Sequence, residues 1–130
     1  MSKRRFKYGN KPCEYAGIKF ASHKERDYYI YFKSLEDSGE IKDLRLQVDF
    51  ELVPGIYEER VKHYVRKPDV TYQHCIQDPI YYRADFVYVS TTTGKEVVVD
   101  AKSEATKKNR VYQMKKKMMK ALLGLDIVEV

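Results

Sequence analysis

Two acidic residues and a lysine between residues 83 and 103 could together bind a cation and act on an anionic substrate. The stretch RADFVYVSTTTGKEVVVDAKS has the pattern of two strands joined by a turn rich in Thr and Gly. If Ser90 pairs with Lys95 around this turn, Asp85 lies directly opposite Asp100. Carboxylates in such positions repel each other. The pair therefore calls for a counterion, and Mg²⁺, which prefers oxygen ligands, is the expected one.

Lys102 joins the two carboxylates because side chains alternate between the faces of a strand. Asp100 and Lys102 share one face, while Ala101 points to the other. The nearly continuous apolar run EVVVDA is typical of a strand covered on both faces. The simpler alternative is an exposed hairpin with solvated aspartates. A slip of one residue in the pairing would also place Asp85 opposite Ala101 instead.

A helix is predicted from about residue 22 to residue 38. Ser22 and Glu25 form a capping-box pattern, and Gly39 supplies a stop. Glu25 points inward with the apolar face of this helix. That face consists of Tyr28, Tyr29, Phe32 and Leu35. Glu25 is therefore a further candidate site residue, although capping alone would also explain it.

The stretch IKDLRLQVDFELV alternates strictly between apolar and polar residues and predicts a strand with one covered face. The apolar set on that face is Leu44, Leu46, Val48, Phe50 and Leu52. Gln47 lies on the opposite, polar face. Residues 54–80 contain three prolines and are predicted to form an insertion or a short hairpin that contacts substrate.

A second helix is predicted after the hairpin, because apolar residues recur there at helical spacing until Gly124. These residues are Val111, Met114, Met118 and Leu122. A short strand, DIVEV, closes the chain. The resulting order of helix, three strands, helix and strand predicts a single α/β domain over residues 1–130.

The composition favours a folded chain without a membrane segment. With 130 residues and 43% hydrophobic residues, the chain can bury a core. No apolar run approaches the roughly 18 residues of a membrane span, and the start lacks the apolar core of a signal peptide. We therefore expect a cytosolic protein. Cys13 and Cys75 lack a pairing pattern, and His74 and Cys75 with the remote His63 make only a faint zinc pattern. The two cysteines are interpreted as reduced and structural.

Positive charge is concentrated near the two ends of the chain. Residues 2–11 contain five basic residues and no acid, within a predicted basic arm over residues 1–15. Residues 107–120 contain seven basic residues and no acid, whereas a merely solvated helix face usually mixes both signs. This pattern predicts DNA as a partner. The candidate phosphate contacts are Lys107, Lys108, Lys115, Lys116 and Lys120.

The element order, with Glu25, Asp85, the triplet DAK at 100–102 and a basic second helix, resembles the PD-(D/E)XK nuclease superfamily. The segments KYGNK, GIKFASHKERDYY, GEIKDLRLQ and RADF resemble small phage-encoded proteins of that superfamily whose function has long been unknown. Two departures stay within the superfamily pattern, namely Ala84 in place of Pro and Asp100 as the shorter acid. A literal PD at residues 68–69 is interpreted as a coincidence, because it lies 31 residues before Asp100.

The resemblance implies a restriction-endonuclease-like αβββαβ core, with a central mixed sheet flanked by helices, and a Mg²⁺-dependent DNA endonuclease. Asp85, Asp100 and the Ala101 carbonyl would hold the metal, for which Mn²⁺ is expected to substitute. Glu25 would bind it directly, through water, or with a second ion. Lys102 would orient or deprotonate the attacking water.

Several alternatives stay open at this point. Gln47 and Gln113 are candidates for supporting the ligands or contacting phosphate, although a solvated glutamine is the simpler interpretation of each. The enzyme could be a resolvase of branched DNA, a nicking enzyme or a repair-type nuclease. The chain could act as a homodimer, in the host cytoplasm if it is encoded by a phage. The alternative in another class is a non-catalytic nucleic-acid-binding or phage assembly protein that retains the fold.

Overall fold

A four-stranded mixed sheet forms the centre of the protein. The computed structural model describes residues 11–130. The strand order is β3-β6-β7-β8, with β3 (Ile41–Val53), β6 (Ile80–Ser90), β7 (Glu96–Asp100) and β8 (Ile127–Glu129). The first three strands are antiparallel neighbours, and β8 runs parallel to β7. The architecture is therefore mixed α/β, as the sequence predicts.

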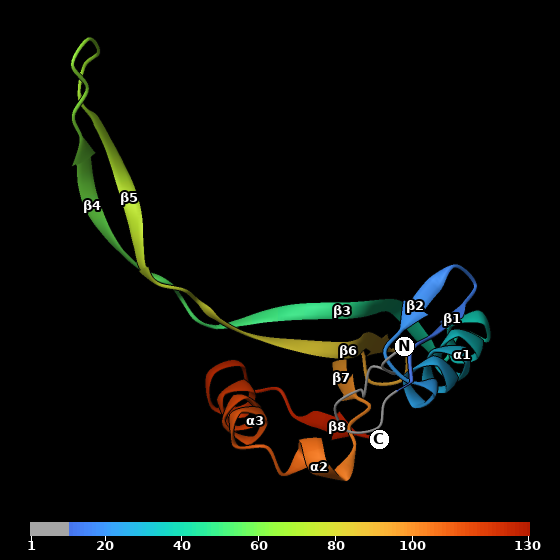
Figure 1. Cartoon of the computed structure of the whole chain (residues 1–130). Helices are drawn as coiled ribbons and strands as arrows, with labels where there is room; N and C mark the ends of the chain where they lie inside the picture. Colours follow the sequence, from blue (N-terminus) through green and yellow to red (C-terminus); the bar gives the residue numbers. More distant parts are fainter. Residues whose placement is uncertain (1–10) are drawn as a thin grey trace, which may run out of the picture.

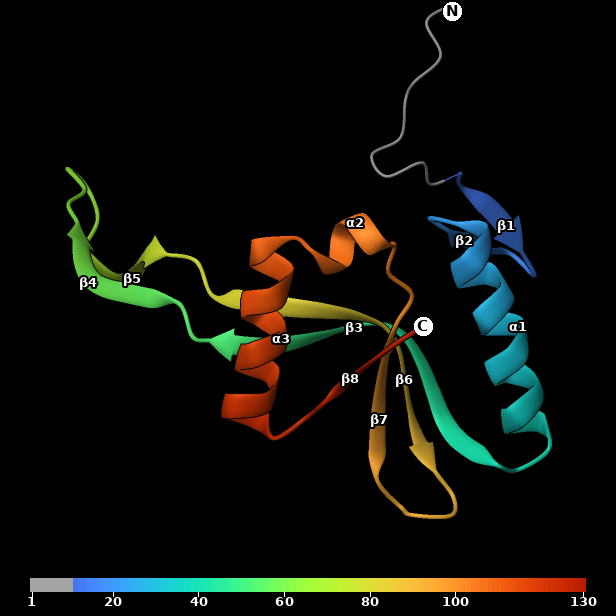
Figure 2. The ribbon, with the colours of Figure 1, turned by 90° about the horizontal axis from the view of Figure 1, so that it is seen from below.

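Two helices cover the sheet from opposite sides (Figures 1 and 2). Helix α1 (His23–Asp37) contributes Phe32 to an apolar cluster with Phe86 and Val99. Helix α3 (Arg110–Leu123) contributes Met119 to a second cluster with residues such as Val98. A short helix, α2 (Glu104–Lys107), leads into α3. Within residues 11–130, none of the helices has the length and apolar character required to cross a membrane.

Helix α1 begins and ends where its capping signals predict. The Ser22 hydroxyl accepts a hydrogen bond from the Glu25 amide at 3.1 Å, and Gly39 has the left-handed φ of 83°. The predicted apolar face packs on the sheet through Tyr28, Tyr29, Phe32 and Leu35. This places Glu25, in the first turn, against the sheet.

The predicted hairpin register is confirmed. Phe86 lies opposite Val99, Val89 lies opposite Glu96, and the Ser90 amide donates to the Lys95 carbonyl at 3.0 Å. This register brings Asp85 to the level of Asp100, one step beyond the last regular pair. Strand β7 is covered on both sides, because Val98 belongs to the cluster under α3 and Val99 to the cluster under α1.

Strand β3 does not keep its apolar residues on one face, so that prediction is wrong. Leu44 and Leu46 pack in the cluster under α1, whereas Val48, Phe50 and Leu52 pack in the cluster under α3. The change occurs at Gln47, whose φ of 52° interrupts the regular alternation of a strand. Figure 2 shows β3 bending between α1 and α3.

Helix α3 turns a different stripe toward the sheet than the sequence pattern indicates. Val111, Met114 and Leu122 are each more than half exposed, while Tyr112 and Met119 are buried. The ring of Tyr112 packs against that of Tyr82, with centroids 6.5 Å apart. Because α3 carries apolar residues on two sides, the packing partner decides which side is covered. The helix still ends at Gly124, as predicted.

Two hairpins lie outside the central sheet. Strands β1 (Cys13–Tyr15) and β2 (Ile18–Phe20) form the first, so the predicted basic arm over residues 1–15 is a strand from residue 13. Residues 1–10 of that arm lie outside the described part. Strands β4 (Ile56–Lys62) and β5 (Val70–Gln77) form the second. This hairpin, predicted within residues 54–80, projects far from the body (Figure 1).

Candidate active site

The structure brings the predicted acids together beside the bend of the sheet. Glu25 comes from the first turn of α1, Asp85 from the middle of β6, and Asp100 from the end of β7. All three are buried, with exposed fractions of 7%, 8% and 0%. Buried carboxylates are rare unless they are paired or bind a cation. We call these three residues the acidic cluster.

Gln47 links two members of the acidic cluster. Its side-chain amide nitrogen donates to Glu25 Oε1 at 2.7 Å and to Asp85 Oδ1 at 3.2 Å. Gln47 is exposed, which agrees with the simpler interpretation of a solvated glutamine. Its amide also lies on the solvent side of Glu25 and Asp85. The left-handed backbone at this position directs its side chain toward them. A strained residue at such a place is typical of functional sites.

Asp85 and Asp100 each accept a hydrogen bond from the other strand. The Asp85 amide donates to Asp100 Oδ1 at 3.4 Å, and the Ala101 amide donates to Asp85 Oδ2 at 2.9 Å. The Tyr82 hydroxyl donates to the other oxygen of Asp100. The two carboxylates are thus fixed by β6 and β7. Tyr82 was not predicted, although it precedes Asp85 by three residues in the same strand.

Lys102 lies at the edge of the acidic cluster, as predicted. Its ammonium is 3.4 Å from Asp100 Oδ1 and 5.9 Å from the centre of the Tyr112 ring, and its side chain is partly exposed. The Lys24 ammonium donates to the Lys102 carbonyl at 3.2 Å, which ties this segment to α1. Lys102 can therefore act on a group that approaches from solvent.

Two of the acids, Glu25 and Asp100, have raised pKa values. Burial, with a further contribution from the charge of Asp85, raises the pKa of Glu25 to about 7. Burial also raises the pKa of Asp100 to about 6, against the opposing effect of Lys102. The single ammonium of Lys102 does not offset the cost of three buried carboxylates. The cluster therefore favours an additional positive charge near neutral pH.

A family model described as "Protein of unknown function (DUF1064)" matches residues 5–124. The chain belongs to this family. No curated protein and no solved structure matches it. The acidic cluster, Gln47, Lys102 and α3 all lie within the DUF1064 match, and their chemistry is the basis for inferring what this DUF1064 domain does.

The acidic cluster of the DUF1064 domain suits a hard cation in the type of its ligands. Carboxylate oxygens from Glu25, Asp85 and Asp100 are the donors that Mg²⁺ prefers. Within residues 11–130, no three His, Cys, Asp or Glu side chains are arranged as a ready ligand set. The oxygens of the cluster accept hydrogen bonds from protein groups, since Gln47 joins Glu25 to Asp85, while Tyr82 and backbone amides donate to Asp85 and Asp100.

A pocket of about 340 Å³ opens beside Lys102. Its lining residues are Tyr82, Arg83, Lys102, Thr106, Asn109, Val111, Tyr112 and Lys115. Three of them are cations, of which Arg83 also pairs with Asp49 at 2.8 and 3.1 Å. The pocket therefore offers positive charge and hydrogen-bond donors next to Asp100. Such a lining is chemically complementary to an anionic group such as a phosphate.

The lysines predicted to contact DNA fall into two groups. Three pair with acids outside residues 107–120: Lys107 with Glu104, Lys116 with Glu129, and Lys120 with Asp126. Their charge is thus partly compensated, contrary to the expectation of a helix without acidic partners. The acids of β8 and its preceding turn lie beside α3, and the sequence pattern did not take them into account. Among the described residues, Lys108 and Lys115 form no ion pair.

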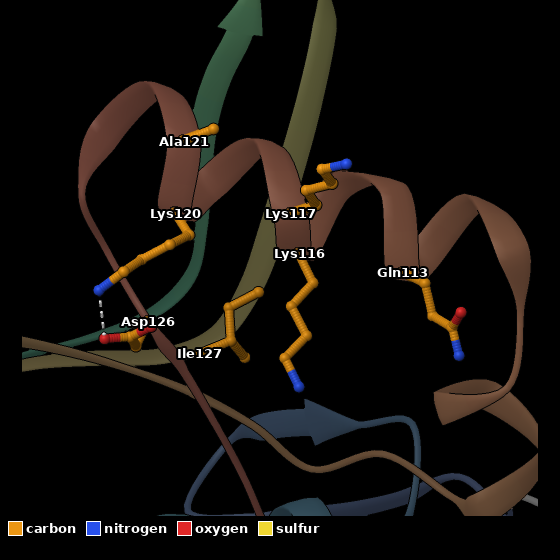
Figure 3. A pocket seen from close by; sticks show the side chains of 7 residues that line it. All are labelled: Gln113, Lys116, Lys117, Lys120, Ala121, Asp126 and Ile127. Atoms are coloured by element: carbon orange, nitrogen blue, oxygen red, sulfur yellow. Dashed lines mark hydrogen bonds and ion pairs between the residues drawn. The ribbon is translucent and has the colours of Figure 1, made fainter.

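A larger pocket of about 690 Å³ lies between α3 and β8, away from the acidic cluster (Figure 3). Figure 3 shows Lys120 bonded to Asp126 and Gln113 toward the other end of the helix. The Gln113 amide donates to the Lys107 carbonyl at 3.0 Å and so ties α2 to α3. Unlike Gln47, Gln113 therefore does not reach the acidic cluster.

The other polar candidates lie elsewhere. Asp69 of the literal PD pair lies near the tip of the β4–β5 hairpin, where its carboxylate is 3.0 Å from His63 Nδ1. This agrees with its interpretation as a coincidence. Cys13 and Cys75 are both free thiols, as expected.

The raised pKa of Glu25 predicts how the metal-free protein responds to pH. The folded state holds this proton more tightly than the unfolded chain, whose value is 4.5. The corresponding stability is present below pH 4.5 and is lost as the pH rises through 7, up to about 3 kcal/mol. Glu25→Gln removes this loss, so its unfolding free energy relative to the parent should increase between these pH values.

Urea unfolding in EDTA at several pH values measures this difference. Asp100 titrates in both proteins, so its contribution should largely cancel. A difference between the two proteins that does not change with pH would contradict the assignment of Glu25 as a buried acid with a raised pKa.

Proposed function

We propose that this DUF1064 chain is a Mg²⁺-dependent DNA endonuclease with a PD-(D/E)XK core. The observation that carries the proposal is the acidic cluster with Lys102 at its edge, assembled from α1, β6 and β7. Three buried acids beside one lysine lower the stability of the folded protein, because buried charges need compensation, so a role in stability does not explain them. Binding without chemistry does not require them. The order of the elements along the chain supports the proposed αβββαβ core, with α1, β3, β6, β7, α3 and β8 in its six positions.

Glu25, Asp85 and Asp100 are the residues that would hold Mg²⁺. The chemistry that Mg²⁺ supplies when bound is polarisation of the scissile phosphate and a lower pKa for water. When Mg²⁺ binds, the Gln47 amide would give up its hydrogen bonds to Glu25 and Asp85. It is exposed, and it occupies the oxygens that the metal would need. Tyr82 keeps Asp100 oriented from the buried side.

Lys102 would act on the phosphate or on the attacking water. Its ammonium lies between the acidic cluster and the pocket lined by Lys115, so it can reach a phosphate seated in that pocket. There it would orient or deprotonate the water and offset the negative charge that develops in the transition state. Lys115 would hold the DNA backbone without reading its sequence.

Cleavage of closed-circular DNA tests the proposal directly. The parent chain should nick or linearise a plasmid in Mg²⁺ or Mn²⁺ and should be inactive in EDTA. Branched, nicked and linear DNA of the same sequence then identify the preferred substrate. If the folded protein binds DNA but cleaves none of these with either metal, the non-catalytic binding role is correct.

The ion pairs of α3 predict which lysines bind DNA. The logarithm of affinity should fall with the logarithm of salt concentration by about 0.9 for each phosphate contacted. Lys108→Ala and Lys115→Ala should each flatten this slope by about one. Lys120→Ala is the matched control and should have a smaller effect, because Lys120 pairs with Asp126 at 2.9 Å. Equal slopes in all three variants and the parent would exclude this contact surface.

A further inference from the structure

The β4–β5 hairpin, which we call the arm (residues 56–77), exposes apolar side chains over its whole length. Six of them have exposed fractions between 41% and 53%: Ile56, Tyr57, Val61, Val70, Tyr72 and Ile76. Strands β4 and β5 pair only with each other among the described strands. An isolated two-stranded hairpin is at best marginally stable in water, and exposed apolar patches mark interaction sites. The arm therefore calls for a partner.

The charges of the arm are separated along its length. The loop end carries Lys62, Arg66 and Lys67, and the Lys62 and Lys67 ammonium groups lie 5.3 and 5.8 Å from the centre of the Tyr64 ring. The loop end also carries Asp69, which lies 3.0 Å from His63. The end next to the body carries Glu58, Arg60 and Glu59, followed just after the arm by Asp78. Glu58 is already paired with Arg60, whereas Glu59 and Asp78 are exposed and form no ion pair among the described residues.

An apolar pocket of about 350 Å³ lies where the arm joins the body. Pro79, Ile80 and Tyr81 form one side of it. The other side is a stripe of α3 with Val111, Met114 and Met118, of which Val111 and Met114 are more than half exposed, whereas Met118 also packs against the cluster under α3. The exposure of this stripe is unexplained by the fold itself. At the loop end of the arm, Val65 is fully exposed.

We propose that the arm is a dimerisation element, which binds the arm of a second copy in antiparallel orientation. Antiparallel pairing about a two-fold axis places each basic loop end on the acidic base of the other arm. It also brings Val65 of one copy to the apolar pocket of the other. A two-stranded ribbon also fits the DNA major groove, but Glu59 and Asp78 would repel the phosphates there. The charges therefore favour a second copy.

The mass of the full chain in solution, without DNA or metal, tests this proposal. Sedimentation equilibrium should give twice the 15.4 kDa of one chain. A tip variant (Lys62→Glu with Lys67→Glu) and a base variant (Glu59→Lys with Asp78→Lys) should each raise the dimer dissociation constant at least about tenfold, because like charges then face each other. The matched control reverses two exposed lysines of the body, Lys19→Glu with Lys95→Glu, and should stay dimeric.

Mixing the two variants tests the antiparallel arrangement. In a dimer of one tip variant and one base variant, both contacts again join opposite charges, so a 1:1 mixture should recover the parent affinity. A parallel dimer would also recover in this mixture, so the mixture of the tip variant with the parent chain separates the two arrangements. In antiparallel arms that pair keeps one repulsive contact between two acidic ends, whereas in parallel arms its tips attract each other, so recovery of the parent affinity in the mixture with the parent would overturn the arrangement.

A parent chain that stays monomeric over the whole concentration range, with native circular dichroism, would overturn the proposal. In that case, loss of DNA affinity in the tip variant would identify DNA as the occupant of the arm. None of these measurements depends on DNA cleavage. The dimer and the nuclease can therefore fail separately.

Discussion

Asp85→Asn is expected to abolish Mg²⁺-dependent cleavage of DNA while DNA binding survives. Asp85 lies at the centre of the acidic cluster, where its two oxygens accept from Gln47 and Ala101. Asparagine keeps the shape but loses the charge that a cation requires. Residues that only orient metal ligands typically contribute about 10- to 100-fold, so loss of a direct ligand should exceed about a hundredfold.

A plasmid cleavage assay, with circular dichroism as a check of the fold, measures this effect. Asp69→Asn is the matched control, because it changes the literal PD pair by the same chemistry at the tip of the arm. The control should cleave like the parent. The proposed site would be refuted if Asp85→Asn cleaved DNA normally, or if only Asp69→Asn lost cleavage.

Lys102→Ala is expected to lower the rate of the chemical step by at least about a hundredfold, the usual contribution of a positioned acid-base or charge-stabilising group. The Lys102 ammonium is 3.4 Å from Asp100 and faces the pocket beside it. Removing it should leave DNA affinity nearly unchanged and metal affinity unchanged or higher, because one competing cation is lost.

Single-turnover cleavage separates this effect from binding. Lys95→Ala removes an exposed lysine that is not among the candidate phosphate contacts and is the control for the loss of one positive charge. If the single-turnover rates of the parent and Lys102→Ala agree, Lys102 is a surface lysine without a role in the reaction.

The local patterns of the sequence predicted those parts of the site that depend on near neighbours. The hairpin register followed from a short turn, since Ser90 and Lys95 are close in the chain. The inward position of Glu25 followed from its helical spacing to Tyr29 and Phe32 on the apolar face of α1. Both inferences need only a few residues around one turn.

The contacts of Gln47 depend on pairs that are distant in the chain. Gln47 meets Asp85 across the β3–β6 pair, 38 residues away, and no local signal gives this register. The same holds for the change of face at Gln47, because the apolar alternation continues unchanged through it. The ion pairs of Lys116 and Lys120 likewise depend on where the chain turns after α3.

The continuity of the arm with the central sheet bears on the order of folding. In β3 and β6, Ile41 pairs with Ser90, which requires the closure of a loop of 49 residues. Loop closure costs entropy, and long-range strand pairing is slow for that reason. The arm offers another route, since Lys62 and Val70 pair across a short loop and the same two strands continue into β3 and β6 (Figure 1). Pairing can then spread from the loop end toward the sheet, so that Gln47 and Asp85 meet through a series of short steps.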